Sequence, residues 1–206
     1  MITSTANPRV KAVLALRKRR ERDRTGRFLV EGRRELARAL AAGIAVHDVL
    51  VCQALLARAA GMMDPAMGAR AALTRANSDT GGAGVVEHAE TTGAAVTEVA
   101  ESVFARVSYR DNPDGVLGVA RAFDTGLDGL DLAGEADPLV LVVAEVEKPG
   151  NLGTMLRSAS AAGASAVVVA DPVTDVFNPN VVRSSQGALF GVPVAVGDAA
   201  AVVVWL

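Results

Sequence analysis

The chain has 206 residues, half of them hydrophobic, which suits one large domain or two small ones with an ample core. Its single cysteine, Cys52, excludes a disulfide framework and a cysteine-based metal site, and two distant histidines suggest no metal cluster, so we predict no metal. The N-terminus lacks the apolar region of a signal peptide, and no apolar run reaches the roughly 18 residues of a membrane span. We therefore expect a cytoplasmic protein without membrane association.

Positive charge is concentrated near the N-terminus, although the whole chain carries a net charge of -2. Residues 1–40 hold 12 of the 21 lysines and arginines but 4 of the 23 aspartates and glutamates. This polarity predicts that one end of the chain meets a polyanion and that binding weakens with added salt. A solvated basic helix face is the alternative. The candidate contact residues are Arg9, Lys11, Lys18, Arg19, Arg20 and Arg27.

Helical and strand patterns alternate through the first part of the chain. They predict a helix over residues 7–22, a strand over 28–30, a helix over 31–42, a strand over 46–52 and a helix over 53–60. Loop signals dominate residues 62–84, around a short helix at 66–75. A helix over 85–93, a strand over 96–99, a helix over 101–107, a turn over 109–115 and a strand over 116–123 follow.

An acidic, glycine-rich segment, residues 124–137, has the composition of a linker. It divides the chain into a first domain of residues 1–123 and a second domain of residues 138–206.

The second domain opens with a strand, turn, helix and strand. Residues 139–143 form an apolar, β-branched run, Pro149 and Gly150 interrupt it, and Asn151 is a candidate N-cap for a helix that ends near Gly163. Residues 165–170 form a second buried strand, and a crossover of this kind makes the two strands parallel. A helix from Pro179, a strand over 192–196 and a helix capped by Asp198 complete the pattern.

The turn between strand and helix is the candidate site for chemistry, because free N–H groups at a helix N-terminus attract anionic or polar ligands. Arg157 lies four residues after Gly153, so its guanidinium shares a helix face with a residue that leaves room for a substrate group. The spacing matches neither a dinucleotide-binding glycine motif nor a P-loop. Asn151 as a plain cap and Arg157 as a solvated arginine are the alternative.

The segment PGNLGTMLRSASAAGA resembles the first signature of the SpoU (TrmH-like) family of RNA ribose 2′-O-methyltransferases, P-x-N-x-G-x-x-x-R-[ST]-A. Residues 178–196, NPNVVRSSQGALFGVPVAV, resemble the next family segment. ITSTANPRVKAVLALRKRR and GRFLVEGRREL resemble its N-terminal RNA-binding domain, and YRDNPDGV is similar to a phrase before the family's domain boundary. These segments stand in the family's order and span nearly the whole chain.

The resemblance implies an α/β protein with an N-terminal L30e-like sandwich domain that binds RNA, followed by a SPOUT-type methyltransferase domain with a trefoil knot. It implies methyl transfer from S-adenosyl-L-methionine to a ribose 2′-hydroxyl of rRNA or tRNA, and a homodimer formed through the knotted domain. By position, Arg157 matches the catalytic arginine, Asn151 the asparagine that helps to place it, and Arg183 an arginine implicated in some members.

Family members continue with a G-x-E-x-x-G motif and an I-P-M-x-G-x-x-x-S-L-N-x-x-x-A motif, and neither is present in these 206 residues. Those segments make most of the cofactor site, so no cofactor-binding residue can be named from this sequence. We expect the methyltransferase domain to be incomplete here, with weak or absent binding of S-adenosylmethionine. A non-catalytic RNA-binding protein or an inactive methyltransferase fragment is the alternative function. An unrelated α/β nucleotide-binding enzyme is disfavoured because its glycine pattern is missing.

Overall fold

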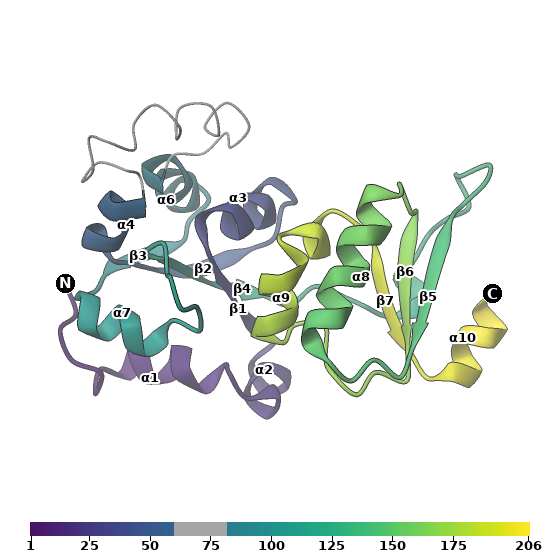
Figure 1. The fold of residues 1–206 in the computed structure, drawn as a ribbon, viewed down its shortest axis with the longest axis horizontal. Coiled ribbons are helices and arrows are strands. Elements are labelled where there is room, and N and C mark those ends of the chain that lie inside the picture. Colours follow the sequence, from purple (N-terminus) through teal and green to yellow (C-terminus); the bar gives the residue numbers. More distant parts are fainter. Residues whose placement is uncertain (60–81) are drawn as a thin grey trace. The chain divides into compact units, whose positions relative to one another are not determined.

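The computed structural model describes residues 1–59 and 82–206 (Figure 1). They form two compact units, Met1–Arg121 and Ala122–Leu206, which are described separately below. The short helix predicted at residues 66–75 lies outside the described residues.

The first unit is built on a four-stranded mixed sheet in the order β1-β4-β2-β3. Its strands are β1 (Arg27–Glu31), β2 (Val46–Val51), β3 (Ala95–Glu98) and β4 (Val116–Arg121). β4 pairs antiparallel with both β1 and β2, and β3 pairs parallel with β2. All of β4 except its last residue is buried, because helices cover both faces of the sheet. All four predicted strands are confirmed.

Helices flank both sides of this sheet (Figure 1). They are α1 (Pro8–Ala15), α2 (Arg19–Thr25), α3 (Arg33–Ala41), α4 (Gln53–Ala59), α6 (Gly82–Thr91) and α7 (Glu101–Val107). α1 and α7 supply Val10, Val13 and Phe104 to a core with Leu29 of β1 and Val119 of β4. On the opposite face α3 approaches so closely that a Cβ atom on Gly118 of β4 would lie 2.8 Å from Leu36 Cδ1.

The single helix predicted over residues 7–22 is wrong: α1 ends at Ala15 and α2 begins at Arg19. Helical periodicity over residues 7–22 would place Arg22 on the outside, yet its side chain is buried, 5% exposed. Its Nη1 donates to the carbonyl oxygens of Leu16 and Arg17, both at 2.9 Å. These carbonyls have lost their helical partners at the break, and leaving such groups buried and unpaired is costly. The Arg22 guanidinium therefore stabilises the break.

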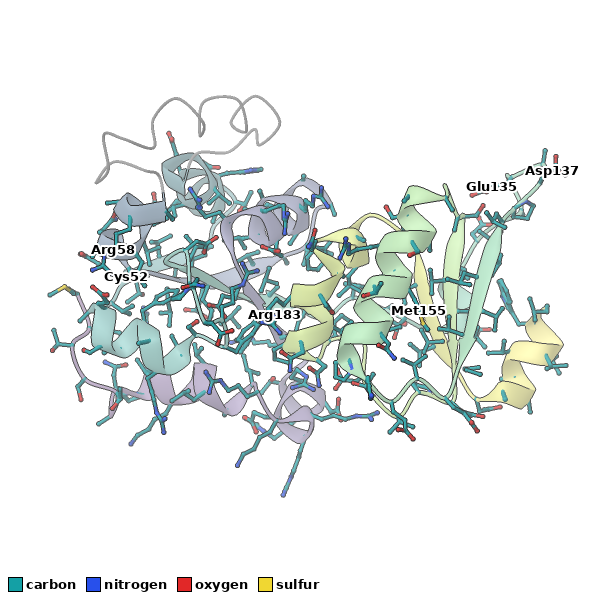
Figure 2. All side chains as sticks on the ribbon, in the orientation of Figure 1. Cys52, Arg58, Glu135, Asp137, Met155 and Arg183 are labelled. Atoms are coloured by element: carbon teal, nitrogen blue, oxygen red, sulfur yellow. The ribbon has the colours of Figure 1, made fainter. Side chains whose placement is uncertain are left out.

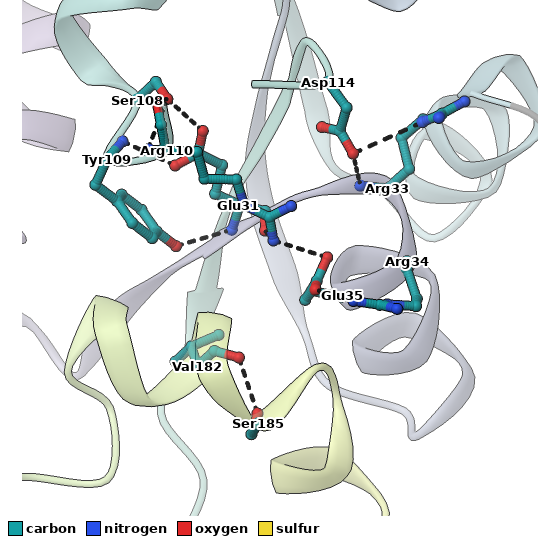
Figure 3. Close-up of polar contacts among 10 residues, drawn as sticks. All are labelled: Glu31, Arg33, Arg34, Glu35, Ser108, Tyr109, Arg110, Asp114, Val182 and Ser185. Atoms are coloured by element: carbon teal, nitrogen blue, oxygen red, sulfur yellow. Dashed lines mark hydrogen bonds and ion pairs between the residues drawn. The ribbon is translucent and has the colours of Figure 1, made fainter. Parts of the chain in front are cut away.

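A polar cluster ties the end of β1 to the loop before β4 (Figure 3). The buried Glu31 carboxylate accepts hydrogen bonds from Ser108 Oγ at 2.5 Å and from the Tyr109 backbone N–H at 2.9 Å. Tyr109 Oη lies 3.0 Å from the Glu31 backbone N–H, which donates to it. Arg110 Nη2 donates to the Glu31 carbonyl at 2.5 Å and forms an ion pair with Glu35 at 2.9 Å. The family-like phrase at residues 109–115 thus holds β1 and α3 in place.

Glu31→Gln is expected to remove a stabilising contribution that grows on mild acidification. Burial raises the pKa of the Glu31 carboxyl above 4.5, although hydrogen bonds from Ser108 and Tyr109 oppose the shift. The folded state therefore takes up this proton at a higher pH than the unfolded chain, so the Glu31 contribution to stability grows as pH falls through the folded pKa towards 4.5. Thermal unfolding of both proteins between about pH 7 and pH 5 tests this. A difference in Tm between them that stays constant, or changes in the opposite direction, would contradict it.

The second unit contains a parallel sheet in the order β5-β6-β7. Its elements are η2 (Leu127–Gly129), β5 (Val140–Ala144), α8 (Pro149–Ala161), β6 (Ala166–Ala170), α9 (Pro179–Ser185), η3 (Ala188–Phe190), β7 (Val194–Gly197) and α10 (Ala199–Trp205). The predicted strand–helix–strand crossover is confirmed. α8 and α9 lie on one side of the sheet and α10 on the other (Figure 1). Asp198 caps α10 as expected, accepting from the Ala201 N–H at 2.8 Å.

Part of the segment with linker composition packs against this second sheet. Leu127 and Leu130 contact the core formed by Val168 and Ala170 on β6 and their neighbours, and the Val196 N–H donates to the Thr125 carbonyl at 2.7 Å. Ser165 Oγ also bonds Glu135. Apolar side chains within an acidic, glycine-rich stretch are what allow it to pack. Among the described helices, none is long and apolar enough to cross a membrane.

Candidate functional site

The first candidate surface is basic and lies on α1, α2 and the start of β1. We call the exposed set Arg9, Lys11, Lys18, Arg19, Arg20 and Arg27 the basic surface. Arg9 Nη1 donates to Thr97 Oγ1 at 2.7 Å, and Arg19 lies 3.6 Å from Asp23 across one helical turn. All six sequence-predicted residues therefore remain open to a ligand at the surface.

Two other arginines of the same run hold the fold together. Besides Arg22, Arg17 donates from Nη2 to the carbonyls of Arg106, Val107 and Ser108 at 2.7–3.1 Å. These are carbonyls at the C-terminal end of α7, where a cation is also favoured by the helix dipole. The arginine run thus divides into residues that join helices and residues that face solvent.

The second candidate site lies on α8 and α9, which carry the three sequence-predicted catalytic residues. Asn151 and Arg157 are on α8. Arg183 is on α9 (Figure 2). All three are exposed. The prediction that Asn151 caps α8 is wrong, because the helix begins at Pro149 with Lys148 at the cap position. Proline suits the first helical position, where no N–H is needed, and Asn151 lies within the first turn with its amide exposed.

Gly153 does not leave room for a substrate, contrary to the sequence interpretation. It is buried where α8 crosses α9, and a Cβ atom there would lie 2.0 Å from Ser184 Oγ and 2.7 Å from the Ser185 backbone nitrogen. Ser184 Oγ donates to the Asn180 carbonyl of its own helix at 2.6 Å and lies 3.4 Å from the Pro149 carbonyl of α8. The absent side chain serves close helix packing. Because Arg157 lies one turn beyond Gly153 and Arg183 adjoins Ser184, this contact positions both arginines.

Gly153→Ala is expected to lower the free energy of unfolding by about 1–3 kcal/mol, because part of the clash is with backbone atoms that cannot rotate away. Gly150→Ala is the matched control: it lies in the same helix, and nothing comes within 4 Å of its Cβ position. Alanine is the better helix former, so the control should be neutral or stabilising. Chemical denaturation of the two variants measures the difference. Equal stability would contradict the proposed helix contact.

Two residues at the carboxyl ends of the strands have a feature that the sequence did not reveal. Glu145 follows β5 and Asp171 follows β6, and both are non-glycine residues in the left-handed region, with φ of 50° and 43°. The Glu145 N–H donates to the Ala170 carbonyl at 3.0 Å, and the Asp171 N–H donates to the Gly197 carbonyl at 2.9 Å. The hydrogen bonds between neighbouring strands therefore continue one residue past the end of β5 and of β6. Open parallel sheets bind ligands at this edge. Glutamate gives no sequence signal for such a turn.

Within residues 1–59 and 82–206, no three potential ligands among histidine, cysteine, aspartate and glutamate gather to hold a metal ion.

Comparison with protein families covers both units. A model of the MRM3-like substrate binding domain matches residues 7–118, and a model of the SpoU rRNA Methylase family matches residues 138–205. The chain belongs to the SpoU rRNA methylase family. The predicted family is thereby confirmed, and the α/β fold expected from it is the one observed.

Relatives of this SpoU methylase chain are similar over most of its length. The 23S rRNA (guanosine(2553)-2′-O)-methyltransferase RlmP of Bacillus subtilis is 31% identical over 193 residues, which is 94% of this chain and 63% of the relative. A crystal structure of an RNA 2′-O ribose methyltransferase matches this chain with a TM-score of 0.72 at 38% identity. The match covers 99% of this chain and 68% of the chain in that structure. The structure of an AdoMet-bound rRNA methyltransferase from Sinorhizobium meliloti matches with a TM-score of 0.76 at 27% identity. This match covers 99% of this chain and 67% of the chain in that structure. The chain thus spans slightly less than two thirds of RlmP.

Proposed function

We propose that the protein transfers a methyl group from S-adenosylmethionine to a ribose 2′-hydroxyl of ribosomal RNA. The observation that carries this proposal is the pair of family matches, a substrate-binding domain at residues 7–118 followed by a methylase domain at residues 138–205. The RlmP relative is named for ribose methylation of 23S rRNA, and the Sinorhizobium meliloti structure contains AdoMet. We extend these two properties to this chain.

The basic surface of the first unit would hold the RNA. Its six exposed cations offer donors to backbone phosphates, and such contacts position a nucleic acid without reading its sequence. The affinity should fall steeply with salt, because phosphate neutralisation releases counterions.

Arg157 would act at the reacting ribose. A guanidinium offers N–H donors and no acceptor, so Arg157 is unsuited to act as a base. From its exposed position on α8, Arg157 can bind the phosphate next to the target ribose. It can also stabilise the negative charge that develops on O2′. Asn151 is exposed six residues earlier on the same helix, and Arg183 is exposed on α9. We assign these two to placing the same groups.

S-adenosylmethionine, when bound, supplies a methyl group on a sulfonium ion. The carboxyl edge of the second sheet, with its left-handed turns at Glu145 and Asp171, fits the place where parallel sheets bind nucleotide-like ligands. We assign no side chain of this chain to the cofactor.

We also propose a cytoplasmic homodimer. A ribosomal RNA substrate and one buried, unpaired cysteine suit a reducing compartment. A two-fold dimer is the commonest assembly of a soluble enzyme.

A non-catalytic RNA-binding protein is the second candidate, favoured by the concentration of basic residues in the first unit. Incubation with 23S rRNA and radiolabelled S-adenosylmethionine separates the two. Methyl transfer would place label in a dinucleotide that resists alkali, because 2′-O-methylation removes the hydroxyl that cleaves the adjacent phosphodiester. Salt-sensitive RNA binding without any label would favour the second candidate, or the inactive methyltransferase fragment that the missing cofactor motifs predict.

A further inference from the structure

Two arginines far apart in the chain lie opposite each other on neighbouring strands of the first sheet. Arg27 is the first residue of β1 and Arg121 the last residue of β4, and the antiparallel register pairs them directly. Side chains paired in this way leave the same face of a sheet, with Cβ atoms about 4.5–5.5 Å apart. Both residues are exposed. Two guanidinium groups therefore start from neighbouring points on one surface.

The backbone fixes both starting points. Gly26 ends α2 in the left-handed conformation, with φ of 62°, and its N–H donates to the Arg22 carbonyl at 2.8 Å. The chain therefore turns directly from α2 into β1 at Arg27. Arg121 is held on its other side by the residue before β2, since its N–H donates to the Ala45 carbonyl at 2.8 Å. Only the side chains remain free to adapt to a ligand.

Neither guanidinium has a carboxylate partner within the part of the chain that the structure describes. Two exposed arginines of α2 differ, because Arg24 pairs with Glu21 at 2.5 Å and Arg19 lies 3.6 Å from Asp23. Like charges directly opposite on antiparallel strands destabilise a sheet. The two positive charges therefore lower the stability of the sheet, and a bound anion would remove this loss.

We propose that Arg27 and Arg121 bind one phosphate of the RNA backbone between them. Guanidinium groups match phosphate oxygens with paired, charge-assisted hydrogen bonds, and two of them can share the oxygens of a single phosphate. This inference rests on the proposed function, since it names a contact within the same RNA complex. Arg121 extends the basic surface beyond the N-terminal run, and only the strand register reveals it.

RNA binding by Arg27→Gln, Arg121→Gln and the double variant tests the proposal. If both side chains hold one phosphate, each single change should weaken binding roughly tenfold, and the double change should weaken it little further. The slope of log affinity against log salt should decrease by about 1 in each case. Arg106→Gln is the matched control: it removes the same charge from an exposed position on α7. It should leave affinity nearly unchanged.

Thermal unfolding gives a readout that needs no RNA. Neutralising either arginine should raise Tm, because it removes the like-charge pair. Inorganic phosphate should raise Tm of the wild type more than that of Arg121→Gln, since only the wild type keeps the pair.

The outcomes separate this inference from the proposed function. If the wild type binds RNA with a strong salt dependence and all three variants match it, the inference is overturned while RNA binding stands. If phosphate stabilises the wild type selectively but RNA affinity does not respond, the pair binds free anions and the RNA assignment is wrong. If the wild type binds no RNA, the proposed function fails, and with it the RNA assignment of the pair.

Discussion

Arg110→Ala is expected to lower the free energy of unfolding of the first unit by about 3–5 kcal/mol, the usual result of removing one partner from a buried ion pair. The Glu35 carboxylate opposite Arg110 has only 2% of its side chain exposed. The variant also deprives the Glu31 carbonyl of its donor. Space around the pair is already filled, because a Cβ atom on Gly32 would lie 2.5 Å from Arg110 Nη2. Urea or guanidinium denaturation measures the loss.

Arg34→Ala is the matched control for this experiment. Arg34 also contacts Glu35, at 3.2 Å, but its own side chain is 53% exposed. An exposed partner of this kind contributes about 0–1 kcal/mol. Equal losses for the two variants would contradict the account, because they would show that burial of Arg110 adds nothing.

Arg157→Ala is expected to reduce methyl transfer by about 10²–10³-fold, the usual effect of removing one group that stabilises developing negative charge. The side chain is exposed, so Tm should not change. RNA affinity should fall far less than the rate, because the six residues of the basic surface remain. Single-turnover methylation with excess enzyme measures the chemical step.

Arg157→Lys and Ser160→Ala refine the same test. Lysine keeps the positive charge but loses the planar pair of donors, so it should restore part of the rate. Ser160 is exposed on α8 and lies outside the family signature, so its replacement should leave the rate unchanged. Full activity in Arg157→Ala would remove this residue from the mechanism, and full activity in Arg157→Lys would reduce its role to charge alone.

The elements that local pattern determines were predictable. Runs of β-branched residues gave β5 and β6, and Gly163 ends α8 in the left-handed conformation that the sequence suggested. The Asn178–Pro179 pair begins α9 as expected, with the asparagine accepting from the Asn180 N–H at 2.9 Å. Each signal acts within a few residues, so the sequence alone is enough to read it.

Features that depend on distant partners were not predictable. The break between α1 and α2 requires the buried guanidinium of Arg22, which periodicity places on the outside. The role of Gly153 depends on Ser184, some thirty residues later. Likewise, the pairing of Arg27 with Arg121 follows from the register of two strands that are far apart in the chain. Composition identified the basic region but not which of its arginines support the fold.

Ribose methylation of ribosomal RNA is tested most directly in cells that carry or lack the gene for this protein. The 2′-O-methyl groups of their ribosomal RNA can be mapped by the alkali resistance of the adjacent phosphodiester bonds. We expect one ribose to lose its methyl group in the deletion strain, to regain it with the wild-type gene, and to remain unmethylated with Arg157→Ala. An identical methylation map in the two strains would contradict the proposed function.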